Sequence, residues 1–459
     1  MRAAAGPCAL GGGLVGLVGL GGVGRGGVGR GVAGTLAAVK ILVVGTGARE
    51  HAITRALALD PSVTGLHAAP GNPGIGAVAT LHPVDPLDGT AVADLARELG
   101  ADLVVVGPEA PLVAGVADAV RAAGIPVFGP SAQAARLEGS KAFAKEVMAA
   151  AGVPTAEPRV ARTVDEAVAA IDELGAPHVV KEDGLAAGKG VVVTEDRQVA
   201  VDHARACLAK EGGAVVVEEY LDGPEVSLFV LADGTDVVPL VPAQDFKRAL
   251  DDDKGPNTGG MGAYTPLPWA PEGLVDEVLE TVARPTVAEM ARRGTPFVGV
   301  LYCGLALTSK GVRVVEFNAR FGDPETQVVL ARLRTPLAGV LHAAATGGLG
   351  ALAPLEWSDE AAVTVVVASE GYPAAPRTGD VITGLDVAES VEGVHVLHAG
   401  TALDDEGHVV SAGGRVLSVT ATGADLAQAR ERAYVAVASI GLAGSHHRAD
   451  IAAKASAAS

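Results

Sequence analysis

The chain has 459 residues, a formal net charge of −19 and a pI near 5.0. This length allows two to four domains with substantial cores, and an acidic chain without a basic run is not expected to bind nucleic acid. Its three cysteines, Cys8, Cys207 and Cys303, are too far apart in sequence for a zinc motif or a disulfide framework. We therefore expect a soluble cytoplasmic enzyme, with no membrane partner.

Residues 1–39 differ from the rest of the chain. They are rich in Gly, Val and Leu and contain no acidic residue, and Arg25 and Arg30 interrupt the apolar run before it reaches a membrane-spanning length. A signal peptide or anchor, a start assigned too far upstream, and a disordered segment are the three interpretations. We favour the second interpretation, in which the natural start lies near Lys40 and opens directly on the first strand. If residues 1–39 are made, we expect them to be disordered.

Residues 40–139 alternate between strand and helix patterns. Strands are predicted at 41–44, 65–69, 103–106 and 126–128, with helices ending at Leu59 and spanning 90–99 and 112–123. This alternation indicates a parallel, Rossmann-like sheet, whose ligands bind at the carboxyl ends of the strands. The loops 45–51, 70–74 and 107–111 lie at such ends. The glycine turn at 45–51 also opens a helix and could bind an anion, although any turn closing a βα unit looks similar.

Residues 140–334 form the second predicted domain. A compact α+β unit over 159–230 is followed by a polar loop at 245–264, a helix at 272–293 and a hairpin of strands 297–307 and 312–318. Residues 335–445 are predicted to form a small β-rich domain with strands 362–368, 379–382, 395–399 and 414–420 and a helix at 425–440. Residues 446–459 are predicted to be a flexible tail.

The strand at 311–318 carries the clearest chemical pattern. Side chains alternate along a strand, so Val315 and Phe317 are predicted on one face, and Val314, Glu316 and Asn318 on the other. A carboxylate and an amide oxygen two residues apart suit Mg²⁺, which takes few protein ligands and fills its remaining positions with water and phosphate oxygens. Arg320 would project the same way if the strand continued. The alternative is a half-exposed strand with polar residues facing water.

The loop after Lys181 is a candidate lid. It holds Lys181 and Lys189 around three glycines, Gly184, Gly188 and Gly190, between two predicted strands, and such a loop can cover a polyphosphate. The alternative is a mobile hairpin with solvated lysines.

Two further stretches are candidate binding elements. The strand at 215–219 ends in Glu218 and Glu219, with Glu225 shortly after it; such carboxylates could hold ribose hydroxyls, although acidic strand ends are common. The segments 244–248 and 257–264 bracket a charged loop, and the Gly-rich second segment favours an ordered wall over disorder.

These segments together resemble the phosphoribosylamine–glycine ligase family of purine biosynthesis, which has an ATP-grasp fold. The resemblance covers residues 40–441, in the order 45–51, 69–72, 107–113, 137–143, 181–191, 218–221, 244–248, 257–264 and 316–327. It implies an α/β and α+β multidomain chain. An N-terminal parallel-sheet domain, an ATP-grasp domain whose lid subdomain lies at about 159–230, and a small C-terminal β-rich domain are expected.

The resemblance implies that ATP phosphorylates glycine and that the amine of 5-phosphoribosylamine attacks the glycyl phosphate. Glu316 and Asn318 would hold Mg²⁺ or Mn²⁺, and Arg320 and Lys181 would be catalytic. The implied ATP site comprises Lys141, Lys181, Asp183, Gly184, Gly188, Lys189, Gly190, Glu218, Glu219, Leu221 and Glu225.

The implied site for glycine and 5-phosphoribosylamine draws on the predicted domains at 40–139 and 140–334. It comprises Gly47, Arg49, Glu50, Asp245, Lys247, Asn257, Gly260, Met261, Asp323 and Glu325. A monomer or weak dimer is expected.

The sequence departs from the family pattern at four positions. Thr46 and Ala48 stand where Asn and Gly are usual, Glu182 replaces a small residue and Phe246 replaces a usual His. None of these removes a charge assigned to ATP or metal, but Thr46 and Phe246 put fine contacts to the sugar phosphate in doubt.

Two rival functions remain on sequence grounds. Another ATP-grasp carboxylate–amine ligase would keep the ATP-binding half but not both 45–51 and 257–264. A non-catalytic nucleotide-binding regulator would have lost Glu316, Asn318 or Arg320, and all three are present.

Overall fold

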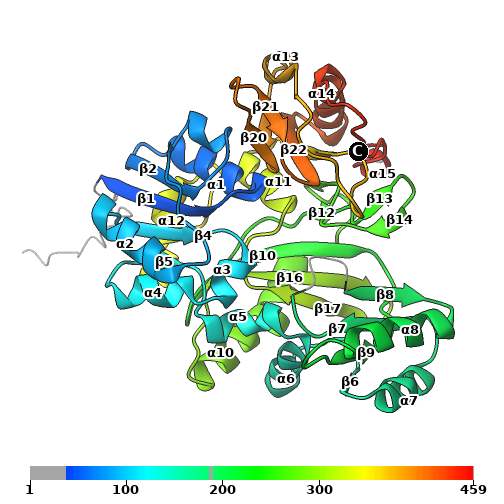
Figure 1. Ribbon diagram of the computed structural model, residues 1–459. Helices are drawn as coiled ribbons and strands as arrows, with labels where there is room; N and C mark the ends of the chain where they lie inside the picture. Colours follow the sequence, from blue (N-terminus) through cyan, green and yellow to red (C-terminus); the bar gives the residue numbers. More distant parts are fainter. Residues whose placement is uncertain (1–37, 186–189, 458–459) are drawn as a thin grey trace, which may run out of the picture. The chain divides into compact units, whose positions relative to one another are not determined.

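The computed structural model describes residues 38–185 and 190–457 (Figure 1). Most of the predicted leader lies outside these residues, and so do Gly188 and Lys189 of the predicted lid. Among the described residues, no helix combines the length and apolar character needed to cross a membrane.

The first sheet is parallel, as the alternating pattern predicted. Its strands are β1 (Val39–Gly45), β2 (Val63–Pro70), β3 (Thr80–Leu81), β4 (Leu103–Val106) and β5 (Val127–Phe128), in the order β3-β2-β1-β4-β5. The connections carry α1 (Ala48–Ala58), the short η1 (Ile75–Ala77), α2 (Gly89–Leu99), α3 (Glu109–Val113) and α4 (Val116–Ala122). The helix predicted at 112–123 is divided because Gly115 adopts φ +86° between α3 and α4.

A second sheet lies within the segment that was predicted to be the lid subdomain. After α5 (Ala132–Gly139) and α6 (Lys141–Ala151), strands β6 (Pro158–Ala161), β7 (His178–Glu182), β8 (Val191–Thr194) and β9 (Val215–Glu218) pair antiparallel in the order β6-β9-β7-β8. Helices α7 (Val164–Leu174) and α8 (Arg197–Leu208) pack on this sheet through a small core of their own. The predicted boundary at residue 230 is too late, because β10 (Glu225–Asp233) belongs to the next sheet.

The third sheet holds the strand with the predicted metal ligands. It has the order β11-β10-β16-β17, with β11 (Val237–Pro239), β16 (Val298–Thr308) and β17 (Gly311–Asn318). The helix predicted at 272–293 consists of α9 (Leu274–Val278), the π-helical η2 (Leu279–Ala283) and α10 (Arg284–Arg292). The β16–β17 hairpin confirms the sequence pattern.

A β-bulge corrects the predicted faces of β17. Gly304 pairs with Glu316 and Leu305 with Val314, so Val315 has no partner across the ladder. An extra residue reverses the alternation. Val314 and Phe317 are therefore both buried in the core, at 0% and 2% exposure, and Val314 does not share a face with Glu316 as predicted.

The C-terminal sheet recruits strands from the middle of the chain. Its order is β12-β15-β18-β22-β19, from β12 (Gln244–Asp245), β15 (Gly262–Thr265), β18 (Ala361–Ala368), β22 (Arg415–Gly423) and β19 (Val394–His398). Hairpins β13 (Arg248–Leu250)–β14 (Lys254–Asn257) and β20 (Thr401–Leu403)–β21 (Val409–Ser411) flank it. Most of the loop predicted at 245–264 is therefore in strands that pair with other strands. The strand predicted at 379–382 is reduced to one β-bridge, Val381 to Val410.

The remaining helices follow the third sheet and close the chain. They are α11 (Glu325–Arg332), α12 (Leu337–Thr346), η3 (Leu349–Ala351), α13 (Leu385–Glu389), α14 (Leu426–Ser439) and α15 (Ala453–Ser456). The predicted flexible tail is wrong for residues 446–457. Arg448, Ile451 and Ala452 are at most 1% exposed.

Phe317→Ala should lower the free energy of unfolding by about 3–5 kcal/mol, because a buried aromatic is removed and the site cannot fully collapse. Phe317 is 2% exposed within the main core cluster. Denaturant unfolding of this variant and of Val315→Ala provides the measurement. Val315 is only partly buried at the bulge, so an equal loss for both variants would contradict this account of β17.

Candidate functional site

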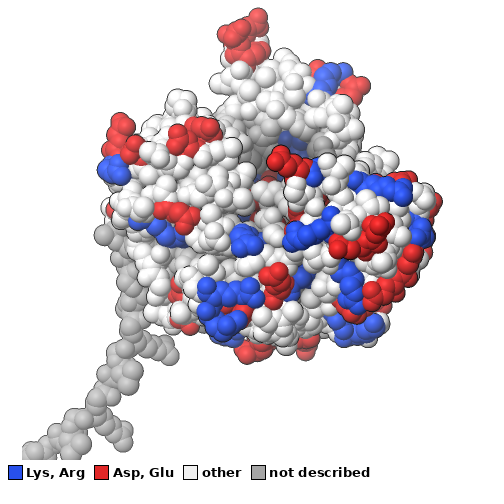
Figure 2. Space-filling model, turned by 60° about the horizontal axis from the view of Figure 1, so that its bottom comes forward, with Lys and Arg blue, Asp and Glu red and all other residues white. Residues whose placement is uncertain are grey.

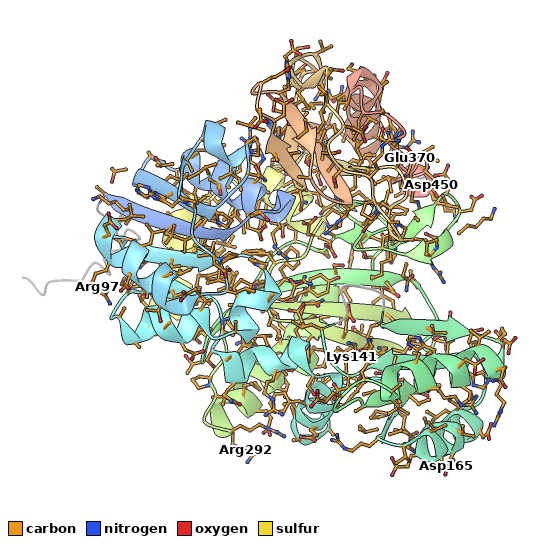
Figure 3. All side chains as sticks on the ribbon, in the orientation of Figure 1. Arg97, Lys141, Asp165, Arg292, Glu370 and Asp450 are labelled. Carbon is orange, nitrogen blue, oxygen red and sulfur yellow. The ribbon has the colours of Figure 1, made fainter. Side chains whose placement is uncertain are left out.

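One cleft, with a volume of about 1830 Å³, collects charged side chains from α1 and α3 of the first domain, from the sheet of β6–β9, from the third sheet and from the C-terminal sheet. Figure 2 shows a hollow in one face of the molecule with acidic and basic side chains around and within it. Figure 3 marks two lining residues, Lys141 on α6 and Asp450 near the C-terminus. The cleft therefore joins segments that are more than 300 residues apart in sequence.

Glu316 and Asn318 lie together on the cleft side of β17. The Glu316 side chain has no hydrogen bond or ion pair with any described residue, and Asn318 Oδ1 lies 3.4 Å from Arg320 Nη2. A half-buried carboxylate without a protein partner is costly unless water or a cation satisfies it. This pair of oxygen donors fits a hard divalent cation.

Next to this pair, two lysines share one buried glutamate. Glu218, at the end of β9, lies 3.2 Å from Lys145 Nζ and 3.0 Å from Lys181 Nζ. Lys181 also donates to the Val315 carbonyl at 2.9 Å, an acceptor that the bulge leaves outside the ladder. Burial lowers the pKa of Lys145 to about 8. Burial acts likewise on Lys181, but Glu218 and Glu316 outweigh it and raise its pKa.

Arg320 is held by two carboxylates from the first domain and its linker. Its Nε donates to Glu109 Oε2 at 3.1 Å, and its Nη2 lies 2.9 Å from Glu138 Oε1. Burial would raise the pKa of Glu109, but Arg320 and Arg49 hold it at about 2. The side chain of Arg320 is only 17% exposed. Its guanidinium is therefore fixed in orientation at the end of β17.

A second charged group surrounds Asp245. Lys247 Nζ lies 3.0 Å from Asp245 Oδ1 and 2.6 Å from Glu225 Oε2. Burial raises the pKa of Asp245 to about 6. Lys247 lowers this pKa, and Glu325 raises it further. Glu325, at the start of α11, accepts hydrogen bonds from Tyr302 at 2.9 Å and Ser227 at 3.1 Å.

Arg49 and Asp323 form the wall contributed by the first domain and the α11 turn. Arg49 Nη1 donates to the Phe321 carbonyl at 3.0 Å, and its Nε to Glu50 Oε1 at 2.5 Å. Asp323 receives an ion pair from Arg415 of β22, at 3.3 Å. Burial favours the neutral form of Asp323, but Arg415 and Arg49 lower its pKa overall.

Most of the predicted site residues line this cleft. They are Arg49, Lys141, Lys181, Gly184, Gly190, Glu218, Glu219, Leu221, Glu225, Asp245, Lys247, Asn257, Glu316, Asn318, Arg320, Asp323 and Glu325.

Five of the predicted site residues that the structure describes do not line it. Asp183 Oδ1 accepts from Ala142 N at 3.2 Å at the start of α6, and Gly47 N donates to Glu50 Oε2 at 2.6 Å. The Glu50 carboxylate therefore occupies the amide site that the glycine turn could offer an anion. Gly260 packs against Pro324 and Met261 is fully buried, so both support the wall from behind.

Three sequence profiles of one family match the chain in order. They describe the phosphoribosylglycinamide synthetase N domain at residues 39–138, the ATP-grasp (A) domain at 139–326 and the C domain at 362–454. A phosphoribosylamine–glycine ligase of Streptomyces coelicolor is 70% identical over 422 residues, 92% of this chain and all of that protein. The chain belongs to the phosphoribosylglycinamide synthetase family.

Other comparisons agree with this family. A phosphoribosylamine–glycine ligase of Leifsonia xyli is 60% identical, over 91% of this chain and all of that protein. A crystal structure of phosphoribosylamine–glycine ligase from Thermotoga maritima has a TM-score of 0.78 at 33% identity, covering 90% of this chain and all of that one. The biotin carboxylase domain of 2-oxoglutarate carboxylase from Hydrogenobacter thermophilus, solved with MgADP, has a TM-score of 0.67 at 19% identity, covering 90% of this chain and 92% of that one. It shares the fold.

The predicted family, fold class and enzyme class are thereby confirmed: the chain is an ATP-grasp ligase. Sequence reasoning missed Lys145, Tyr302 and Arg415 as cleft residues. Lys145 follows Lys141 by one helical turn on α6, and this spacing could have revealed it. Arg415 carries no local signal, since only the pairing of β22 in the C-terminal sheet brings it to Asp323.

Proposed function

We propose that the protein ligates glycine to 5-phosphoribosylamine in purine biosynthesis, consuming ATP and giving glycinamide ribonucleotide, ADP and phosphate. The observation that carries this proposal is that Glu316, Asn318, Lys181 and Arg320 meet in one cleft of a chain in this family. The γ-phosphoryl group of ATP passes to a carboxylate oxygen of glycine. The sugar amine then attacks the carbonyl carbon, the phosphate leaves, and the amine loses a proton.

Glu316 and Asn318 are the residues that would hold a divalent cation, Mg²⁺ in our proposal. The Glu316 carboxylate makes no hydrogen bond or ion pair with any residue that the structure describes, and this supports the assignment. When bound, the cation would neutralise charge on the ATP phosphates.

The residues of the lid and α6 position ATP. Lys141 donates to the Gly184 carbonyl at 3.0 Å and so ties the loop after β7 to α6. Lys181, fixed by Glu218 and the Val315 carbonyl, provides a positive charge that does not reorganise during the reaction. Glu218, Glu219, Leu221 and Glu225 line the adjoining wall, where adenosine would bind. Asp183, Gly188, Lys189 and Gly190 complete the proposed lid.

The opposite walls position the two other substrates. Arg320 faces the developing charge of the acyl phosphate, held in place by Glu109 and Glu138. Asp323 and Glu325 are the proposed acceptors for the glycine ammonium. Arg49, Asp245, Lys247 and Asn257 would take the sugar phosphate and its amine, while Gly47, Glu50, Gly260 and Met261 shape the wall behind them.

The decisive experiment measures ADP release with each substrate omitted in turn. ADP should form only when glycine and phosphoribosylamine are both present. Release with bicarbonate, or with glycine and an unrelated amine in place of the sugar, would contradict the proposal. A cation that is Mg²⁺ or Mn²⁺, a monomer or weak dimer, and a cytoplasmic location stay predictions.

Asp245 predicts a pH dependence of stability. Its pKa is about 6 in the folded protein against 3.8 for the free group, so the folded state binds more protons between about pH 4 and pH 6. Stability from this group is present below pH 4 and lost as the pH rises through 6. Asp245→Asn should therefore gain melting temperature relative to the wild type between pH 4 and pH 7.

The matched control is Asp94→Asn, whose side chain is 63% exposed on α2. Its melting temperature should follow the wild type across the same range. If Asp245→Asn also followed the wild type, the raised pKa of Asp245 would be wrong.

A further inference from the structure

The segment 446–452, which we call the C-terminal strap, is fastened to the C-terminal domain along its length. His446 and Ala368 exchange backbone hydrogen bonds of 3.0 and 2.9 Å. Arg430 and Tyr434 of α14 donate to strap carbonyls at Ala449, Ile451 and Arg448, by 2.6, 3.0 and 2.7 Å. The strap is therefore a fixed support.

From this support, the strap contacts all three residues of the turn between β13 and β14, Asp251–Asp253, which we call the aspartate turn. Ala449 N donates to Asp251 Oδ1 at 2.8 Å, Asp252 N donates to Asp450 Oδ2 at 3.0 Å, and Arg448 Nη1 donates to Asp253 Oδ1 at 2.8 Å. Figure 3 marks Asp450 at this place.

The aspartate turn needs such support because of its backbone. Asp252 and Asp253 have φ of +57° and +53°, as in the type I′ hairpin turn, which favours Asn-Gly. Side chains with a Cβ disfavour this region. Two consecutive aspartates there would relax to another turn if the strap contacts were removed.

A change in the turn would reach the cleft directly. β13 and β14 connect Lys247 to Asn257, and Lys247 O accepts from Thr258 N at 2.8 Å. Asp252, Asp253 and Asp450 line the cleft beside these residues. The guanidinium carbon of Arg448 also lies 4.8 Å from the ring centroid of Phe246, between Asp245 and Lys247 in sequence. Arg448 itself is 1% exposed and does not line the cleft.

We propose that Arg448 is a positioning residue. Arg448 holds the aspartate turn and the Phe246 ring. In this way it orients Asp245, Lys247 and Asn257 for binding of the sugar substrate. The expected change in KM rests on the proposed function. The positioning role itself is argued from the geometry of the β13–β14 hairpin.

The test compares Arg448→Met with the same variant carrying a turn that needs no support, Asp252→Asn with Asp253→Gly. Arg448→Met should raise the KM for phosphoribosylamine roughly 10–100-fold, as small misplacements do, and leave the KM for ATP within about twofold, since the lid is untouched. The Asn-Gly turn should recover most of that loss. The control Arg432→Met removes an arginine of α14 that binds Thr422 O and Glu392, and should change neither KM.

An unchanged KM for phosphoribosylamine, or a failure of the Asn-Gly turn to lower a raised one, would overturn the proposal. If Arg448→Met does not fold, Asp253→Asn serves instead, because the Asp253 side chain is 66% exposed, and it should raise the same KM by a smaller factor. Hydrogen exchange at the backbone amides of residues 251–258 measures the stability of the hairpin independently of enzyme activity. It should accelerate in Arg448→Met and slow again with the Asn-Gly turn. A wild-type protein without ADP release would contradict only the proposed function.

Discussion

Glu316→Ala should lower turnover roughly 10²–10³-fold, the loss expected for one preorganised electrostatic contact, while the protein still folds. The side chain is half-buried in the cleft and makes no hydrogen bond or ion pair with a described residue, and Lys181 keeps its ion pair with Glu218 when Glu316 is removed. Excess Mg²⁺ should recover part of the activity, because occupancy of a weakened site follows mass action. Glu316→Gln should be nearly as poor, since the charge matters alongside the oxygen.

Three measurements check this result: a melting curve, a Mg²⁺ titration of activity, and binding of Mn²⁺ by equilibrium dialysis. Phe317→Ala, the next residue of β17, is the control. It should lose stability and keep the Mg²⁺ dependence of the wild type. If Glu316→Ala unfolded, or stayed fully active at low Mg²⁺, the metal assignment would be wrong.

The elements that sequence predicted well are those specified by local patterns. The strand predicted at 103–106 has the observed bounds, and so does the helix at 164–174, which the sequence pattern predicts within the α+β unit over 159–230. The first contains only apolar residues between turn signals, and the second opens with the Thr163–Glu166 capping box. The approach of Glu316 and Asn318 to Lys181 was implied by the family resemblance, because no local pattern specifies the distance between strands that are far apart in the chain.

The elements that sequence missed depend on partners distant in the chain. The bulge at Val315 exists only because β17 pairs with β16 in a shifted register, and that shift buries Val314 instead of exposing it. β12 and β15 were assigned to the second domain, yet they extend the sheet of the last. Both features depend on strand pairing, which hydrophobic periodicity does not encode.

The tail was mispredicted for a related reason. The segment 446–459 is short and rich in polar residues and in residues with small side chains, a composition typical of frayed chain ends. Arg448 is nevertheless buried because Asp253 and Asp450 are within 2.8 Å of its guanidinium. Charged residues are rarely buried without partners, and the partner Asp253 lies 195 residues earlier in the chain.

Arg320→Met should lower turnover at least as far as Glu316→Ala and should also destabilise the fold. Loss of the guanidinium removes the charge facing the acyl phosphate, worth roughly 10²–10³-fold. It also leaves Glu138, whose side chain is 8% exposed, as an uncompensated buried carboxylate. Breaking a buried ion pair in this way typically costs about 3–5 kcal/mol. Arg320→Lys keeps the charge but cannot reach Glu109 and Glu138 together, and should be intermediate in stability.

A double variant separates the two roles of Arg320. Adding Glu138→Gln to Arg320→Met removes the orphaned charge, so the melting temperature should return most of the way to that of the wild type. If Arg320 only holds the first domain against β17, the turnover of the double variant should recover together with its melting temperature. Because we expect Arg320 to act on the reacting phosphoryl group, turnover should stay at the level of the single variant. Single-turnover measurement of ADP formation, with enzyme in excess over ATP and with saturating glycine and phosphoribosylamine, distinguishes these results, since it separates phosphoryl transfer from product release.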